Sequence, residues 1–204
     1  MITLINDKSE NRGGSFEMIF TDPPFDMGAG KLHKILSNYQ FEHLVLIASM
    51  RQVLELYPKL DMDFCFDLVA NRSKPKESRS YAMPHYLHNN IFYFKKHGVK
   101  SAFDRRLVAR ADQYSDTKTH YYPTFFDAPK RDIVYRYQKN QQMIDDIIGA
   151  FNVSTVCDMF AGSGTTGLAC VKHEKDCTLI EAETEPFNIM KQQLDFLQVK
   201  YEVL

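Results

Sequence analysis

The sequence predicts an α/β fold, in which helices cover a sheet. Short apolar runs rich in β-branched and aromatic residues alternate along the chain with segments of helical period. This alternation is typical of sheets built from strand–helix units. At 204 residues, the chain is long enough to bury one sizeable core.

The first half of the chain supplies most of the expected strands. We expect strands at residues 2–5, 16–20, 43–48, 63–69 and 91–94, and helices at 31–39 and 51–57. Pro23 and Pro24 end the second strand, because proline has no N–H for a ladder. Pro58 ends the second helix, and residues 71–90 are expected to form a basic, turn-rich loop.

The rest of the chain divides into an irregular segment and a regular one. Residues 98–137 are rich in Arg, Lys, Tyr and Asp with weak periodicity, which indicates an inserted, partly irregular segment. From Gln138 onward we expect a helix with one apolar face, a strand at 155–160, a helix at 166–172, a strand at 177–180 and a helix at 185–196. The predicted division is therefore 1–97, 98–137 and 138–204.

Charge is distributed unevenly along the chain. The formal net charge is −1, but residues 72–139 hold 15 Lys and Arg against 6 Asp and Glu, and the remainder holds 10 against 20. Such a division fits a basic face that contacts phosphates. A solvated basic surface without a partner explains the charge equally well.

The sequence gives no sign of a membrane span, a secretory signal or a metal site. The longest apolar runs, such as 44–48, are too short to cross a bilayer, and polar residues from Asn6 onward interrupt any secretory signal. We therefore expect a cytoplasmic protein. The four cysteines form no C-x-x-C pair and no Cys/His cluster, so we expect neither disulfides nor metal.

A glycine-rich turn follows the strand at 155–160. Its backbone N–H groups and the next helix N-terminus face whatever lies above the strand end. Glu181 ends the following strand, 19 residues after Gly162, where a carboxylate can accept from a ribose diol. The spacing of Gly162, Gly164 and Gly167 also fits an NAD site, although only 37 residues follow. Leu168 excludes a Walker-type phosphate loop, and a tight turn without ligand is the remaining alternative.

A second loop, Asp22-Pro23-Pro24-Phe25, follows the strand at 16–20. The prolines offer no N–H donors, so the loop presents the Asp22 carboxylate and the Pro23 carbonyl as acceptors beside the Phe25 ring. Two acceptors beside an aromatic plate suit a planar group that bears an NH₂. A proline-rich turn that only caps the strand is the alternative.

The pair of loops resembles the DNA amino-methyltransferases that modify adenine N6 or cytosine N4. Residues 21–25 match the catalytic motif, and Asp-x-Phe-x-Gly-x-Gly-Thr-Thr from Asp158 matches the cofactor loop. With the catalytic motif first, the order is similar to the β group of that family. Residues 4–7, 67–72, 89–96 and 138–151 resemble further parts of it, with Asn140 where the family has proline. The resemblance implies a Rossmann-like, S-adenosylmethionine-dependent methyltransferase fold, circularly permuted, with a mixed seven-stranded sheet and helices on both faces.

The resemblance also implies roles for individual residues. Asp22, Pro23, Pro24 and Phe25 would be catalytic, with Asp22 and the Pro23 carbonyl orienting the amine of a flipped base for direct in-line transfer and Phe25 stacking on it. Asp at the head of the motif favours adenine N6 over cytosine N4. No Pro-Cys dipeptide is present, which argues against attack on cytosine C5 through a cysteine. The residues expected to bind S-adenosylmethionine are Asp7, Asp22, Asp158, Phe160, Gly162, Ser163, Gly164, Thr165 and Glu181.

Residues 98–137 stand where such enzymes carry their target-recognition region. The candidates for contacts with DNA are Arg105, Arg106, Arg110, Lys118, Lys130 and Arg131, with Tyr121 and Tyr122 as stacking groups. Surface charge alone explains each of these cations individually. The region is short, which suggests a short recognition sequence or a homodimer, and we expect a stand-alone, restriction–modification or phage-type enzyme.

Other functions are compatible with parts of this pattern. Within methyl transfer, the acceptor could be cytosine N4, an RNA adenine or a protein amide. Outside it, the alternatives are a DNA-binding module that has lost catalysis and a nicotinamide oxidoreductase.

Overall fold

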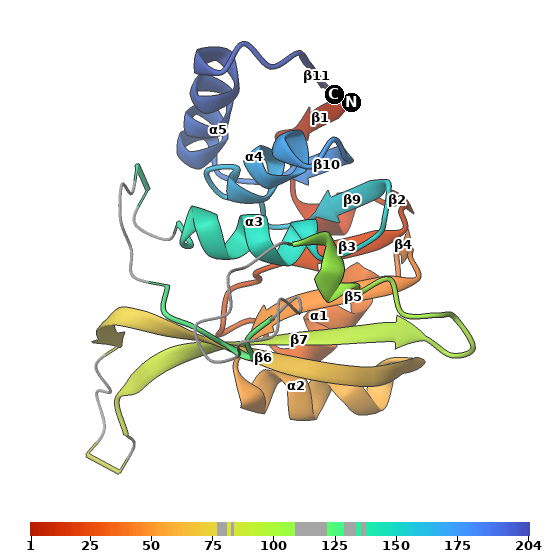
Figure 1. Ribbon diagram of the computed structural model, residues 1–204, viewed down its shortest axis with the longest axis vertical. Coiled ribbons are helices and arrows are strands. Elements are labelled where there is room, and N and C mark those ends of the chain that lie inside the picture. Colours follow the sequence, from red (N-terminus) through yellow and green to blue (C-terminus); the bar gives the residue numbers. More distant parts are fainter. Residues whose placement is uncertain (77–80, 83, 109–121, 129–133, 136–137) are drawn as a thin grey trace.

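A nine-stranded sheet runs through the molecule and carries helices on both faces (Figure 1). The computed structural model describes residues 1–204 except 77–80, 83, 109–121, 129–133 and 136–137. In spatial order the strands are β11 (Tyr201–Val203), β1 (Ile2–Ile5), β10 (Asp176–Ile180), β9 (Thr155–Asp158), β3 (Met18–Thr21), β5 (His43–Ala48), β7 (Tyr86–Lys96), β6 (Met62–Lys76) and β8 (Phe125–Phe126). From β11 to β5 neighbours are parallel, β7 is antiparallel to β5 and β6, and β8 is parallel to β6.

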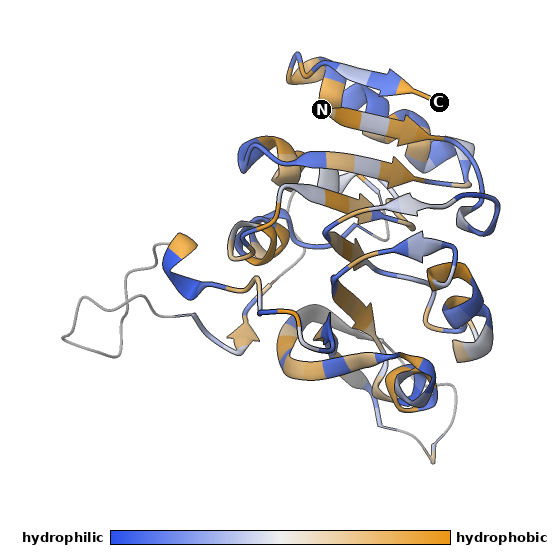
Figure 2. Cartoon of the chain, turned by 90° about the vertical axis from the view of Figure 1, so that its right-hand side faces the viewer, coloured by the Kyte–Doolittle hydropathy of each residue, from blue (hydrophilic) through white to orange (hydrophobic). Residues whose placement is uncertain are grey.

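The sheet lies between two helical layers (Figure 2). The helices are α1 (Ala29–Leu36), α2 (Met50–Leu56), α3 (Gln141–Gly149), α4 (Thr165–Lys172) and α5 (Thr184–Phe196). The short 3₁₀ helices are η1 (Ser9–Asn11), η2 (Tyr57–Lys59) and η3 (Arg105–Leu107), and β2 (Gly14–Ser15) pairs with β4 (Tyr39–Gln40) apart from the main sheet. Buried residues of α1 and α2 form one core cluster, and those of α3, α4 and α5 form the other.

Alternation along the strands assigns each side chain to one of these two cores. In β3, Met18 and Phe20 belong to the cluster under α3 to α5, whereas Ile19 belongs to the cluster under α1 and α2. Both faces of the parallel strands are covered, so β3 and β5 are buried along their whole length. This explains why the sequence shows continuous apolar runs here rather than an alternating pattern.

The order of strands reverses between β9 and β3, which are parallel neighbours with Met18 opposite Val156. From β9 the chain passes through α4 to β10 on one side, and from β3 it passes through α1 to β5 on the other. The two loops therefore leave the same edge of the sheet in opposite directions. In such sheets a crevice opens at this point, outside the carboxyl ends of the strands.

All seven predicted strands lie in the sheet, but the prediction that the sheet has seven strands is wrong, because it has nine. The structure adds β8 and β11, which have two and three residues. The residues of β11 are half-buried or exposed, so no apolar run marked the strand in the sequence. β11 pairs with β1, which brings the two chain ends together (Figure 1).

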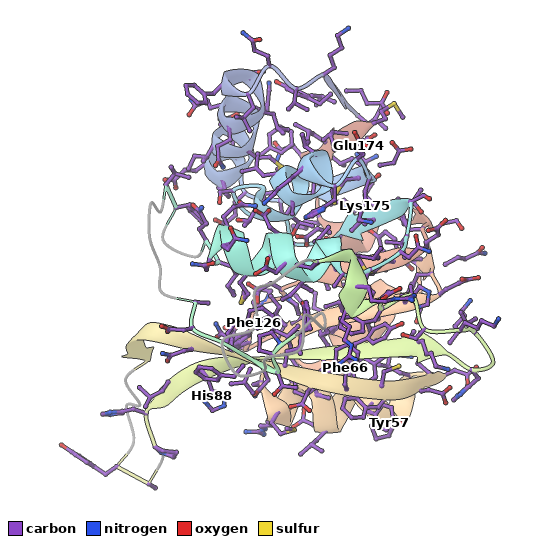
Figure 3. The ribbon with its side chains drawn as sticks, viewed as in Figure 1. Tyr57, Phe66, His88, Phe126, Glu174 and Lys175 are labelled. Carbon is purple, nitrogen blue, oxygen red and sulfur yellow. The ribbon has the colours of Figure 1, made fainter. Side chains whose placement is uncertain are left out.

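The predicted loop at 71–90 is also wrong in part. β6 continues to Lys76 and β7 begins at Tyr86, so the two strands extend as a hairpin beyond the core. Leu87 and His88 in β7 are exposed (Figure 3). An antiparallel pair can face water, and its polar composition therefore suggested a loop.

Residues 98–137 contribute to the fold as well as to the surface. They supply β8 and an aromatic cluster in which Phe103 packs edge-on against Phe66 and Phe151, and Tyr122 packs against Phe103 and Phe126 (Figure 3). Segments 1–97 and 138–204 both supply strands to the one sheet. Within the described part of the chain, none of the helices combines the length and apolar character needed for a membrane crossing.

Candidate active site

A cavity of about 1250 Å³ opens at the carboxyl ends of β3 and β9. It brings together both loops that the sequence singled out. The predicted site residues that line it are Asp22, Pro23, Pro24, Phe25, Asp158, Phe160, Gly162, Ser163, Thr165 and Glu181. Asp7 and Gly164 are not among its lining residues.

The carboxylate of Asp158 joins the two loops. It is 3% exposed, and its Oδ1 accepts hydrogen bonds from Thr21 Oγ1 at 3.2 Å and from Phe160 N at 3.0 Å. Its Oδ2 accepts from Thr166 Oγ1, in the first turn of α4, at 2.6 Å. Protein donors thus engage both oxygens, so Asp158 holds the end of β3 against the glycine-rich loop.

This carboxyl is hard to ionise where it stands. Burial raises the pKa of Asp158 to about 6, the Thr166 hydroxyl opposes that rise, and the negative charge of Asp22 adds to it.

The glycine-rich loop depends on two backbone positions that favour glycine. Gly162 has φ +53° and Gly164 has φ +90°, in the left-handed region that disfavours other residues. A Cβ at Gly164 would lie 2.6 Å from Met190 Cγ, whereas a Cβ at Gly162 would meet nothing within 4 Å. The loop therefore presses against α5 at Gly164 and leaves open space at Gly162.

Side chains from three elements fasten this loop. Glu181, after β10, accepts from Gly162 N at 2.7 Å through Oε2 and from Glu183 N at 2.8 Å through Oε1. Gln193 of α5 donates to the Ser163 carbonyl at 2.5 Å, and Gln141 of α3 donates to the Thr165 carbonyl at 3.2 Å. The loop is consequently held in shape by the protein itself.

The residues around this loop fit the cofactor that the resemblance implies. Ser163 is one of the residues that line the cavity, and its buried Oγ has no hydrogen-bond partner among the described residues. Buried polar atoms are rarely left unpaired, so this hydroxyl indicates a ligand atom. Burial raises the pKa of Glu181, and its two oxygens have lone pairs left for a ribose diol.

The acceptor loop faces the same cavity. Asp22 is 23% exposed at its side chain, Pro23 is buried, and Phe25 is half-buried against the core cluster under α3 to α5 while also lining the cavity. Phe25 thus contacts both the core cluster and the cavity.

Lys139 is a functional residue that sequence reasoning missed. Its Nζ forms an ion pair with Asp22 Oδ2 and lies 5.9 Å from the centroid of the Phe25 ring. The Lys139 side chain is only 18% exposed. Its backbone is fixed by the next residue, since Asn140 caps α3 by accepting from Met143 N at 2.9 Å. The sequence drew attention to residues 138–140, but the contact with Asp22 joins residues 117 positions apart.

Asp7 does not reach the cavity. Its carboxylate accepts from Lys8 N, Asn11 Nδ2 and Arg12 Nε at 2.7, 2.9 and 2.8 Å, and these bonds, that from Asn11 above all, lower its pKa. It therefore stabilises the turn at η1, while Lys8, Ser9 and Glu10 line the cavity instead.

The predicted DNA contacts are only partly described. Arg105 and Arg106 lie exposed on η3, where Arg106 forms a 2.6 Å ion pair with Asp104. Tyr122 is half-buried in the aromatic cluster, and its hydroxyl donates to the Asp146 carbonyl at 3.4 Å. The other candidates, Arg110, Lys118, Tyr121, Lys130 and Arg131, lie outside the described residues.

The cysteines are free thiols, of which Cys157, Cys170 and Cys177 are buried and Cys65 is half-buried. In the parts of the chain that the structure describes, no group of three or more His, Cys, Asp or Glu side chains is placed to hold a metal ion.

Comparison with protein families gives one match. A family model described as N6_N4_Mtase, DNA methylase, matches residues 57–192. No curated protein matches the chain in sequence.

Solved structures share the fold at low sequence identity. The M1.HpyAVI–SAM complex superposes with a TM-score of 0.69 at 19% identity, covering 95% of this chain and 100% of that one. TTHA0409, a putative DNA modification methylase from Thermus thermophilus complexed with S-adenosyl-L-methionine, gives 0.72 at 14% identity, covering 100% and 98%. The PvuII DNA methyltransferase, cytosine-N4-specific, gives 0.65 at 12% identity, covering 93% and 88%.

The two loop glycines should differ in their tolerance of alanine. We expect Gly164→Ala to lower the free energy of unfolding by about 2 kcal/mol or more, because it adds a clash with Met190 to the cost of a left-handed residue. Gly162→Ala should cost about 1 kcal/mol, since only the backbone term applies. Urea unfolding of both variants measures the difference, and equal losses would contradict the close packing against α5.

The raised pKa of Asp158 predicts a pH-dependent stability. The unfolded carboxyl releases its proton near pH 4 and the folded one near pH 6, so the folded state binds more protons between these values. The Asp158 contribution is therefore most favourable at low pH and is lost as pH rises to about 6. Relative to Asp158→Asn, the wild type should lose about 1–3 kcal/mol of unfolding free energy between pH 4 and 7. Urea unfolding across this range tests the prediction, which parallel pH curves for the two proteins would refute.

Proposed function

Because the chain belongs to the N6/N4 DNA methylase family, we propose that it transfers a methyl group from S-adenosylmethionine to the N6 amino group of adenine in DNA. The observation that carries this proposal is the shared cavity. Asp22 and Pro23 line it from the end of β3, and the glycine-rich loop lines it from the end of β9. Donor and acceptor can therefore meet in one cavity.

The glycine-rich loop and Glu181 form the cofactor side of the cavity. Glu181 would accept from the ribose hydroxyls, while Phe160, Gly162 and Ser163 would surround the methionine part. Structures of similar fold were solved with S-adenosylmethionine, which supports this assignment. When bound, the cofactor supplies an electrophilic methyl group on a positively charged sulfur.

The acceptor loop prepares the target amine. The nitrogen lone pair is conjugated with the base ring, which makes the amine a poor nucleophile. Asp22 and the Pro23 carbonyl would accept its two hydrogens, orient the lone pair and favour a pyramidal nitrogen. Phe25 would stack on the flipped base, which offsets part of the cost of unstacking it from the duplex. Among the described residues that line the cavity there is no cysteine, which agrees with a direct transfer.

Lys139 must move before an amine can use Asp22 fully. Its ammonium occupies Oδ2 of that carboxylate and lies near the ring that the base would cover. When the base enters, hydrogen bonds from its neutral amine and stacking on Phe25 therefore replace the contact between the Lys139 ammonium and the Asp22 carboxylate.

Cytosine N4 is the second candidate acceptor. The fold is similar to that of a cytosine-N4-specific methyltransferase, so the fold is compatible with either acceptor. We favour adenine because aspartate, rather than serine, heads the acceptor loop, as the family resemblance implies. The order of the loops along the chain, acceptor first, supports a circularly permuted arrangement of the same fold.

The segment 98–137 would provide the contacts with DNA. Arg105 and Arg106 lie exposed on it, and exposed guanidinium groups suit phosphate oxygens. A segment of this size would recognise a short target sequence, or a second subunit would provide further contacts with the duplex.

Substitution of Asp22 tests the proposal directly. We expect Asp22→Ala to lower kcat by about 10²- to 10³-fold, because it removes an acceptor for the reacting amine. Tritium transfer to unmethylated plasmid DNA measures the rate, and Glu55→Ala on the exposed face of α2 is the control.

Mass spectrometry of nucleosides from the same reaction identifies the modified atom. N6-methyladenine supports the proposal, and N4-methylcytosine would replace it with the second candidate. Methylation of RNA or protein but not of DNA would refute both.

Removal of the Lys139 charge should ease entry of the base. In Lys139→Met the acceptor carboxylate is free, so we expect the KM for DNA to fall by about 2- to 10-fold, with kcat within about 3-fold. Lys139→Arg retains the cation and should keep the wild-type KM. A loss of kcat as large as that of Asp22→Ala would instead show that the ammonium takes part in transfer.

A further inference from the structure

Helix α2 contacts the acceptor loop from behind through one buried side chain. The Nε2 of Gln52 donates to the Met27 carbonyl at 3.0 Å and to the Pro24 carbonyl at 3.3 Å. Gln52 is 4% exposed and is not among the residues that line the cavity. Its own position is fixed because Ser49 caps α2 by accepting from Gln52 N at 3.2 Å.

The acceptor loop needs such an outside donor. Pro23 and Pro24 have no N–H groups, so neither residue can donate a backbone hydrogen bond. The Met27 N–H donates to the Pro24 carbonyl at 2.9 Å, which closes a turn after the prolines. Gln52 then joins this turn to α2 by hydrogen bonds to the Pro24 and Met27 carbonyls.

The locked ring of Pro24 extends this hold to the reacting position. The peptide planes that carry the Pro23 and Pro24 carbonyls meet at the Cα of Pro24, where the ring fixes φ. Once Gln52 holds the Pro24 carbonyl toward α2, ψ of Pro24 is the one backbone rotation left between the two carbonyls. The Pro23 carbonyl is one of the two acceptors required by the proposed function.

An amide group at this position has an energetic cost. Gln52 Oε1 is buried without a hydrogen-bond partner among the described residues, and an unpaired buried carbonyl is destabilising. A leucine would fill similar space without that cost. The two N–H bonds to the loop are therefore the reason for an amide here.

We propose that Gln52 is a positioning residue for methyl transfer, which sets the direction of the Pro23 carbonyl and the place of the Phe25 ring. This inference rests on the proposed function. Gln52 touches neither the target base nor the cofactor in this arrangement. Its effect passes through the turn at Pro24 and Met27 alone, so it acts on the acceptor side and not on the cofactor side.

Kinetics of three variants separate this role from simple packing. Gln52→Leu and Gln52→Met both remove the bonds to the loop, the second with an unbranched side chain of similar length, and kcat should fall about 10- to 100-fold. The dissociation constant for S-adenosylmethionine should stay within about 2-fold. Gln193→Leu is the matched control, since it removes a half-buried amide bond to the Ser163 carbonyl, and it should weaken cofactor binding instead.

Thermal melting and hydrogen exchange provide readouts without activity. The Tm of Gln52→Leu should equal or exceed the wild-type value, while amide exchange in the peptide that spans 25–27 becomes at least about 10-fold faster and exchange at 162–165 is unchanged. Wild-type exchange at 25–27 in Gln52→Leu, or wild-type kcat in Gln52→Met, would overturn the inference. If the wild type transfers no methyl group, the proposed function fails and the exchange data still decide whether Gln52 holds the loop.

Discussion

The carboxylate of Asp158 is the interaction on which the site depends. β3 and β9 are parallel neighbours, but the loops that follow them turn away from each other. An interaction must therefore hold the carboxyl ends of the two strands together while the cavity opens above them. Asp158 does this by accepting from Thr21 on one side and from Phe160 and Thr166 on the other. A buried acid is unfavourable when ionised, and its three donors offset that cost. A residue expected to bind the cofactor thus supports both loops at once.

The two loops are held by different means, in accordance with their chemistry. The glycine-rich loop retains its N–H groups, and Glu181, Gln193 and Gln141 fasten it with a carboxylate and two amides. The acceptor loop has lost two N–H groups to proline, so a buried amide donor must hold its carbonyls. In the glycine-rich loop the buried Ser163 hydroxyl is without a hydrogen-bond partner among the described residues. In the acceptor loop the Asp22 carboxylate pairs with Lys139.

One ion pair in the cavity joins distant parts of the chain. Lys139 enters from the residue before the Asn140 cap of α3 and pairs with Asp22 at the end of β3. Segment 98–137 is likewise tied to the core, because its Phe103 packs against Phe66 and Phe151 and its Tyr122 packs against Phe103. A segment expected to be an inserted recognition region therefore also contributes to the hydrophobic core.

The sequence by itself determined the fold class, the seven main strands and the two loops, because burial and turn chemistry act over short distances. Continuous apolar runs such as His43–Ala48 and the breaks at Pro23 and Gly162 are local signals. Only the tertiary structure decided the rest. The edge strand β11 and the contacts of Lys139 with Asp22 and of Gln52 with Pro24 join distant parts of the chain. The extended hairpin of β6 and β7 is local, but its exposed polar end carries no burial signal. Polar side chains carry no periodic signal of their partners, so their roles follow from the order of strands, which places β9 beside β3.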